Sequence, residues 1–163
     1  MIANFICFGL IVSAFGLALY RAIGPQRSGR LGAAMVILTG LAFVDAGVFV
    51  TDLNGKVVTI LGALHFAAAV TIFFIASPTA AMVMAWRFRD DRGFSAYSAL
   101  TAIAVTIFFI ATVASGNLLG LMERIVIGVV VAWLAILALY LGPWRAANVH
   151  DDHGGLQTTT DEP

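Results

Sequence analysis

Charged side chains are scarce in this sequence: Asp, Glu, Lys and Arg make up 11% of its 163 residues, whereas hydrophobic residues make up 61%. A soluble domain of this size must cover itself with charge, so the balance excludes a soluble globular protein and predicts an integral membrane protein. The nine basic and nine acidic residues cancel at neutral pH. Because phosphate binding needs a basic excess, we expect no nucleic-acid partner, and the partner that the composition predicts is the lipid bilayer.

Cysteine and histidine are also rare, with one and three copies. Cys7 cannot form a disulfide within the chain, and we expect a buried, unreactive thiol because it lies in an apolar run. His65 is the only histidine within an apolar run, which excludes a haem with two histidine ligands inside the membrane. The sequence contains no Gly-rich phosphate loop and no nucleophile–base pair. It therefore predicts no catalytic residue and no metal site, and it leaves the cofactor unknown.

Apolar runs of about 20 residues are long enough to cross a hydrocarbon core about 30 Å thick as helices. The sequence predicts an all-helical bundle of five such spans, at 2–23, 31–50, 57–86, 95–114 and 121–141, the last ended by Gly142-Pro143. Residues 1–145 are expected to form the transmembrane bundle and the polar residues 146–163 a disordered tail. In the third run Pro78 predicts a kink, with the hydroxyls of Ser77 and Thr79 satisfying the carbonyl that the proline frees.

Basic residues are distributed unequally over the turns between these runs. With five spans, one side of the membrane carries Arg21, Arg27, Arg30, Arg87, Arg89, Arg92 and Arg145, and the other side carries only Lys56 and Arg124. The positive-inside rule therefore predicts an N-terminus outside and a tail in the cytoplasm. Aromatic residues that anchor helices at the interface gather on the arginine side, namely Tyr20, Trp86, Tyr97, Tyr140 and Trp144.

A polar cluster is predicted in the outer half of the membrane. Its members are Asp45, Asp52, Lys56, His65, Glu123 and Arg124. An aspartate at bilayer depth costs about 2.5–3.5 kcal/mol on insertion scales, so each of these groups needs a partner. Asp45 and His65 lie at similar depth on consecutive helices and can meet. We expect Arg124 to pair with Asp45 or Asp52.

Two interpretations of this cluster remain open. Its charges either pin the helices together, with Glu123 balancing His65 or Lys56, or they form a binding site. A metal site built from His65, Asp45 and Glu123 is less favoured, because zinc sites usually contain more than one histidine. The tail sequence from His150 to His153 can bind metal only weakly.

Small residues and a repeat bear on assembly. Gly9, Ser13 and Gly16 share one face of the first span, a pattern that lets helix backbones approach closely in lipid. Residues 69–76 and 104–111 share the sequence Ala-Val-Thr-Ile-Phe-Phe-Ile-Ala. Such a repeat can signal the pseudo-symmetry of a transporter, but no other pair of spans matches, which favours local duplication or convergence.

Three segments resemble a known family: residues 47–52, residues 61–65, and residues 120–125 leading to Trp133. They are similar to segments of the prokaryotic multi-spanning membrane proteins grouped as domain-of-unknown-function family 998. The resemblance implies a bundle in the prokaryotic cytoplasmic (inner) membrane. It places the family's aspartate, histidine and glutamate-arginine positions at Asp52, His65, Glu123 and Arg124.

The family typically has six spans and often a proline before its aspartate turn. Here Val50 stands at that position, and the first family span is missing from the expected topology. The resemblance therefore implies other membrane protein subunits, or self-association, as partners.

Three classes of function remain. The favoured one is a membrane protein without catalytic machinery, either an accessory or structural subunit of a larger complex or a small lipid-binding or ligand-binding bundle. The second is a membrane-embedded hydrolase or metal-dependent enzyme that uses Asp45, Asp52, His65 and Glu123. The third is a small transporter, to which Pro78 and the repeat point weakly.

Overall fold

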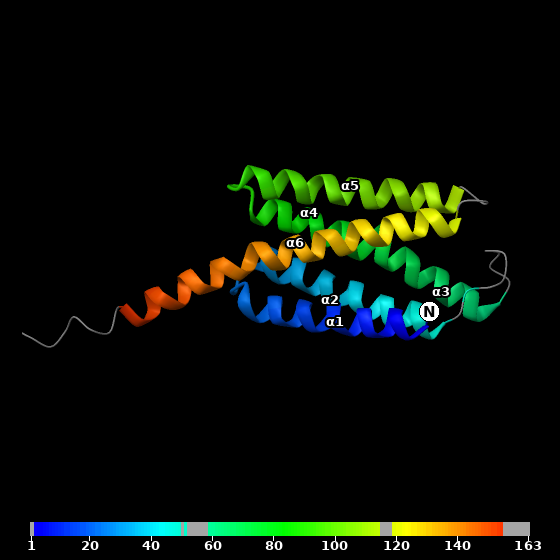
Figure 1. The fold of residues 1–163 in the computed structure, drawn as a ribbon, viewed down its shortest axis with the longest axis horizontal. Helices are drawn as coiled ribbons and strands as arrows, with labels where there is room; N and C mark the ends of the chain where they lie inside the picture. Colours follow the sequence, from blue (N-terminus) through cyan, green and yellow to red (C-terminus); the bar gives the residue numbers. More distant parts are fainter. Residues whose placement is uncertain (1, 50, 52–58, 115–118, 155–163) are drawn as a thin grey trace, which may run out of the picture.

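The computed structural model describes residues 2–49, 51, 59–114 and 119–154, and of residues 119 and 143–154 it describes the backbone alone. Its elements are α1 (Ile2–Ala22), α2 (Arg27–Val48), α3 (Ile60–Val70), the π-helical turn η2 (Thr71–Ala76), α4 (Ser77–Arg87), α5 (Arg92–Ala114) and α6 (Leu119–Gly154). The described part of the chain contains no strand. α3, η2 and α4 continue one another as a single rod (Figure 1).

Five helical segments are long and apolar enough to cross a membrane. They are Ile2–Ala22, Arg27–Val48, Ile60–Arg87, Arg92–Ala114 and Gly120–Gly142. Only 22% to 50% of the most apolar window of each segment is buried inside the bundle, and the outer faces carry large apolar side chains such as Ile11 and Leu139. So much exposed apolar surface is favourable only in lipid. The all-helical, five-span fold predicted from the sequence is confirmed.

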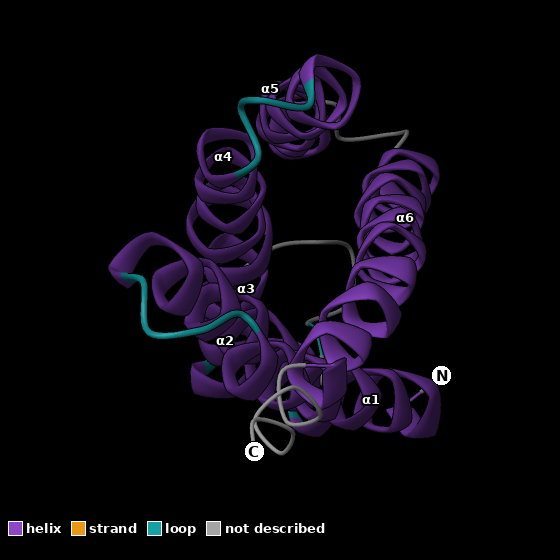
Figure 2. Cartoon of the chain, turned by 90° about the vertical axis from the view of Figure 1, so that its left-hand side faces the viewer, coloured by secondary structure: helices purple, strands orange, loops and turns teal. Residues whose placement is uncertain are grey.

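The helices follow one another around the bundle in chain order, from α1 through α2, α4 and α5 to α6 (Figure 2). Each span packs mainly on the span before and after it in the chain, and α2 contacts α3, η2 and α4 along its length. α1 has α2 as its main neighbour. Cys7, on the far side of α1, is consequently exposed, and the expectation that it is buried is wrong.

The helix ends differ from the prediction most at the start of α2 and at the end of α6. Gly24, with a φ of +80°, makes the first turn without strain, and α2 then begins at Arg27 instead of residue 31. α6 does not end at Gly142-Pro143 but continues to Gly154. A proline inside a helix removes one hydrogen bond and its ring presses on the carbonyl four residues back, which is why an end was expected there. Residues 155–163 lie outside the described residues, and the disordered tail stays a prediction there.

Glycines bring α1 and α2 into backbone contact. A Cβ atom added at Gly9 would lie 2.5 Å from the carbonyl oxygen of Gly40, and one added at Gly16 would lie 2.8 Å from the backbone nitrogen of Ile37. Between them, Ser13 lies directly over Gly40. The small-residue face predicted on the first span is therefore filled by α2 of the same chain, and a partner subunit would have to use another face.

Aromatic rings connect four of the spans in the core. Phe8 of α1 contacts Phe43 of α2 edge to face, with ring centroids 5.0 Å apart. Phe43 in turn contacts Phe73 of η2 at 6.0 Å, and Phe73 contacts Phe109 of α5 at 5.8 Å. Such pairs contribute about 0.5–1.5 kcal/mol each beyond the area they bury. These ring contacts fix which side of each helix faces the core.

The pair α5 and α6 is joined by a polar and an aromatic contact. The indole N–H of Trp133 donates to the hydroxyl of Ser98 at 3.2 Å, and both residues are buried. Nearer the arginine end, Phe94 stacks on Tyr140 with ring centroids 4.1 Å apart. Trp133 is thus a packing residue with a satisfied polar group.

The break expected at Pro78 takes the form of a π-helical turn. The N–H of Ser77 donates to the carbonyl of Ile72, five residues back, at the end of η2. This wide turn places Pro78 in the first turn of α4, where its missing N–H costs least. The hydroxyl of Ser77 lies 3.4 Å from that of Thr39 on α2, whose proton is already donated to the carbonyl of Met35. Ser77 therefore donates to α2, and not to the carbonyl that Pro78 frees.

The contact between α1 and α2 predicts opposite effects of the same substitution at two glycines. Gly40→Ala puts a methyl group against the backbone of α1 and should destabilise the bundle by about 1–3 kcal/mol. Gly128→Ala, on an open part of α6 with no atom within 4 Å, should be neutral or stabilising by up to about 1 kcal/mol through helix propensity. Unfolding in mixed micelles, followed by tryptophan fluorescence, measures both. Equal stability of the two variants would contradict the close contact.

Candidate functional site

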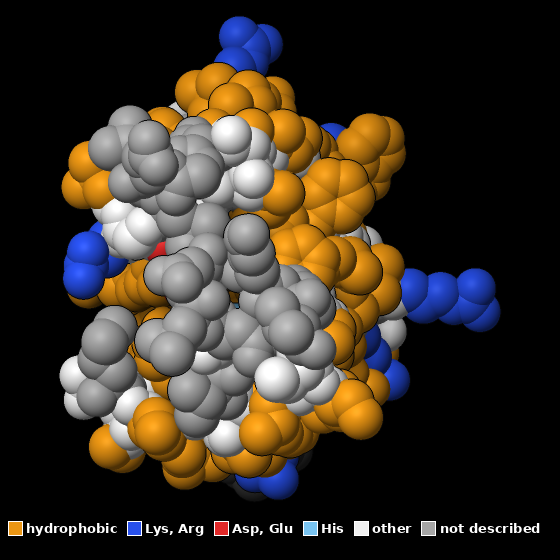
Figure 3. All heavy atoms as spheres, turned by 90° about the vertical axis from the view of Figure 1, so that its right-hand side faces the viewer, with side chains coloured by type: hydrophobic (Ala, Val, Ile, Leu, Met, Phe, Trp, Pro, Cys, Tyr) orange, Lys and Arg blue, Asp and Glu red, His pale blue; other side chains and the backbone are white. Residues whose placement is uncertain are grey.

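The predicted polar cluster belongs to one end of the bundle. The start of α1, the ends of α2 and α5, and the starts of α3 and α6 lie at this end (Figure 1). Seen from that side, the described side chains are mainly hydrophobic, with little acidic surface (Figure 3). Asp52 and Lys56 lie outside the described residues.

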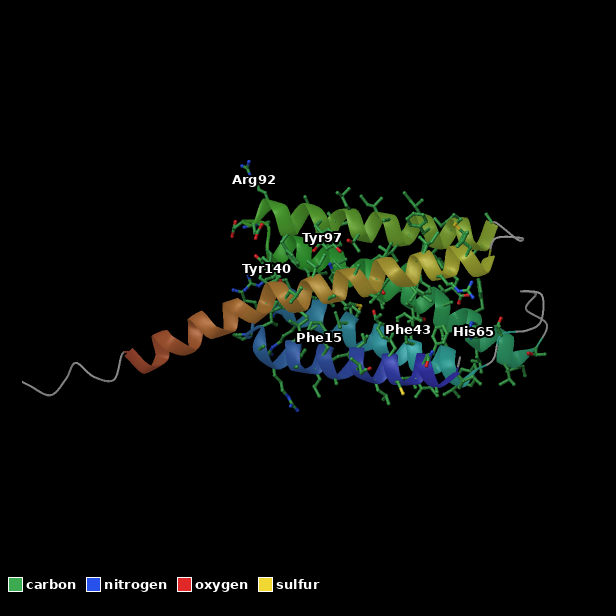
Figure 4. The ribbon with its side chains drawn as sticks, in the orientation of Figure 1. Phe15, Phe43, His65, Arg92, Tyr97 and Tyr140 are labelled. Atoms are coloured by element: carbon green, nitrogen blue, oxygen red, sulfur yellow. The ribbon has the colours of Figure 1, made fainter. Side chains whose placement is uncertain are left out.

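His65 fastens α3 to the end of α2. Its Nδ1 lies 2.8 Å from the carbonyl oxygen of Phe49 and 3.0 Å from that of Ala46. Two carbonyls can only accept, so Nδ1 carries the proton and donates to both. The last carbonyls of a helix have no partner within the helix, and in a membrane water does not replace one. The imidazole therefore satisfies the end of α2 and ties the third span to the second (Figure 4).

Local structure on both helices positions this contact. Thr59 caps the start of α3, where its hydroxyl accepts the N–H of Gly62 at 3.1 Å, and His65 follows one turn later. On α2, Phe49 leaves the helix in an extended conformation, with φ −91° and ψ 117°, while its N–H still donates to the carbonyl of Asp45. In neutral His65 the proton on Nδ1 leaves Nε2 as an acceptor, and the described residues give Nε2 no partner.

Asp45 lies beside this contact but outside it. Sequence reasoning placed Asp45 and His65 at similar depth, where they can meet, yet the histidine binds the backbone one residue later on α2. Consecutive helical residues point about 100° apart, so Asp45 is exposed where Ala46 is buried. The depth followed from residue counting, whereas the choice between carboxylate and carbonyl depended on how the helix is rotated.

Arg124 and Glu123 lie at the start of α6. Arg124 is exposed, and its Nη1 donates to the carbonyl of Gly120 on its own helix at 3.1 Å. No described carboxylate forms an ion pair with it, and α6 packs on α5 instead of α2. Glu123 is partly exposed. Pairing of Arg124 with Asp52 stays a prediction.

The described residues do not gather three His, Cys, Asp or Glu side chains in a way that could hold a metal ion. His65, Asp45 and Glu123 are on three different spans. Of the three, His65 bonds to the backbone of α2, at Ala46 and Phe49. For these residues the geometry supports fastening of helices and offers one acceptor nitrogen on His65.

A second polar region at the opposite end was not predicted. The carboxylate of Asp91 accepts the backbone N–H of Phe94 at 3.1 Å, at the start of α5. This bond, and a second one from the hydroxyl of Tyr140, lower the pKa of Asp91. The sequence signal was available, because an aspartate directly before a helix is a typical N-cap, whose side chain accepts the N–H three residues on. The contact to Tyr140 required the pairing of α5 with α6.

These features define a polytopic helical membrane protein in which His65, Ser77, Ser95 and Trp133 join helices to one another. The family model described as "Protein of unknown function (DUF998)" matches residues 1–140, and the chain belongs to this family. The match reaches from α1 almost to the end of the fifth span and confirms the resemblance. Comparison with curated proteins and with solved structures found no match.

The His65 contact predicts that the stability of the bundle depends on an N–H donor in the side chain at this position. His65→Phe removes the N–H that serves Ala46 and Phe49 and should cost about 1–3 kcal/mol, the penalty for unsatisfied buried groups. His65→Gln keeps an N–H donor and should recover part of the loss. Asp45→Asn, on an exposed neighbour, should stay within about 0.5 kcal/mol of the parent. Micellar unfolding compares the three, and a larger effect at Asp45 than at His65 would refute the assignment.

Proposed function

We propose that this protein is a non-catalytic, five-span accessory or structural subunit of a larger membrane complex. It would lie in the cytoplasmic (inner) membrane of a prokaryote, with its N-terminus outside and its tail in the cytoplasm. Membership in a family without an assigned activity does not contradict this proposal. Binding of lipid or another small ligand is compatible with the same bundle.

The observation that carries the proposal is the use of His65. The partner of a histidine ring nitrogen, whether a carboxylate or a backbone carbonyl, fixes the tautomer and the direction of the ring. Here Nδ1 is held by two backbone carbonyls of α2, while Asp45 is exposed beside them. Because both carbonyls belong to the end of α2, the contact supports a structural role, in which the imidazole ties the third span to the second.

The distribution of arginines supports the proposed orientation. Among the described side chains, six arginines belong to the turns at one end, namely Arg21, Arg27, Arg30, Arg87, Arg89 and Arg92, and Arg124 alone lies at the other. Tyr20 and Trp86, near the six, are exposed on the outer surface of the bundle. Both patterns are typical of the cytoplasmic interface.

The orientation predicts labelling from opposite sides. In a background with Cys7→Ser, a membrane-impermeant thiol reagent should label Asn54→Cys in intact cells and Thr159→Cys only after the membrane is opened. The physical reason is the excess of arginine at the tail end, which resists translocation. Labelling of Thr159→Cys in intact cells would overturn the five-span orientation.

The accessory role predicts a stoichiometric protein partner, which can be a second copy. Purified in a mild detergent and weighed by native mass spectrometry, the protein should exceed the mass of one chain and should carry no stoichiometric metal. Its partner should dock on a lipid-facing side, since α2 fills the glycine face of α1. A monomer that is monodisperse in native-like lipid would contradict the role, and one equivalent of bound metal would favour the metal-dependent enzyme instead.

A further inference from the structure

An open groove lies on the outer side of the bundle between α4 and α5. Its volume is about 380 Å³, and its lining includes Pro78 and Met82 from α4 and Ile103 and Ile107 from α5, with Ala102 between them. This volume falls within the range of small-molecule sites. Because both helices belong to membrane spans, the groove opens toward hydrocarbon, where the molecules at hand are lipids.

Cationic and aromatic side chains lie beyond the arginine end of this groove. Pro78, Met82 and Trp86 follow one another at intervals of four and so share a face of α4. Trp86 is 69% exposed, and the guanidinium of Arg89 lies over its ring, 5.6 Å from the centroid. From Met82 to Arg87, the last residue of α4, the helical rise is about 7.5 Å, and Arg89 follows in the turn. A lipid whose acyl chain lies in the groove would therefore place its polar end near Trp86 and Arg89.

The guanidinium groups at this turn are available for an anion. The contact with Trp86 does not use the N–H groups of Arg89 as hydrogen-bond donors, so they can bind phosphate. Arg92, the first residue of α5, projects outward from the same turn (Figure 4). No described ion pair involves either arginine, and the carboxylate of Asp91 already accepts bonds from Phe94 and Tyr140.

We propose that the groove between α4 and α5, together with Arg89 and Arg92, is a binding site for one anionic phospholipid. One acyl chain lies along Met82 and Ile103, Trp86 lies at the level of the ester groups, and the phosphate binds the two guanidiniums. The apolar groove is followed by positive charge, just as the acyl chain of the lipid is followed by its negatively charged phosphate. The site depends on the membrane insertion of the proposed function and not on its accessory role.

Native mass spectrometry of the full-length protein with added phosphatidylglycerol or phosphatidylcholine tests the site. The parent should retain phosphatidylglycerol in preference to phosphatidylcholine. Arg89→Gln should lower that preference about fivefold, the effect of one basic residue at an anionic surface. Met82→Trp, at a position 47% exposed, fills the groove and should reduce retention of both lipids.

Matched controls separate this site from general attraction. Arg124→Gln makes the same change of charge at the opposite end, and Leu139→Trp, at a position 75% exposed on α6, adds the same bulk on another lipid-facing side. Neither should change retention, and size-exclusion profiles should show that all four variants fold. The proposal fails if Arg89→Gln matches Arg124→Gln or if Met82→Trp matches Leu139→Trp. Failure here with normal insertion and a protein partner would leave the proposed function standing.

Discussion

Hydrocarbon offers no hydrogen bonds, so each backbone polar group inside a bilayer needs a partner within the protein. The end of α2 meets this constraint with the side chain of His65, which donates to the carbonyls of Ala46 and Phe49. The third span meets it at Pro78 by widening the preceding turn. Much of the polar chemistry in the described spans has this purpose, which is why a histidine in the membrane need not indicate a reaction.

Packing in lipid rests on close contact, because apolar side chains gain little by leaving acyl chains for one another. The glycines at the interface of α1 and α2 bring two backbones together, and the row of rings through Phe43 and Phe73 links α2 to the third span. Between these extremes, Thr39 and Ser77 join α2 to the third span through paired hydroxyls. Small residues, rings and hydroxyls thus alternate along α2 in its contacts with neighbouring spans.

The number of spans and their approximate limits could be read from the sequence, because length and apolar content alone determine which segments can cross a bilayer. The close-packing role of Gly9, Ser13 and Gly16 was also visible as a spacing. Their partner was not, since a spacing on one helix does not identify the helix opposite. The α2 span supplies it through Gly40.

The candidate site was harder to predict for the same reason. Depth in the membrane follows from counting residues, which is why Asp45 and His65 were expected at similar depth, and His65 bonds to Ala46, the residue after Asp45. Which atoms meet depends on the rotation of each helix about its axis and on which spans are neighbours. The sequence of a single apolar segment determines neither. Arg124 illustrates this: pairing with Asp45 requires α6 and α2 to be adjacent, and α6 packs on α5.

The two identical octapeptides, 69–76 and 104–111, show how far local sequence determines backbone form. The copy before Ser77 and Pro78 becomes mostly π-helical, while the copy in α5 is a regular α-helix. A π-turn contains one residue more than the α-turn it replaces. The third span therefore has one extra residue, and the wide turn accommodates it without rotating the helix beyond it. Loss of one residue there would leave Ala80 and Met84 facing α2, whereas the same deletion in α5 would rotate everything beyond it by about 100°. The two identical sequences thus differ in their tolerance of a one-residue deletion.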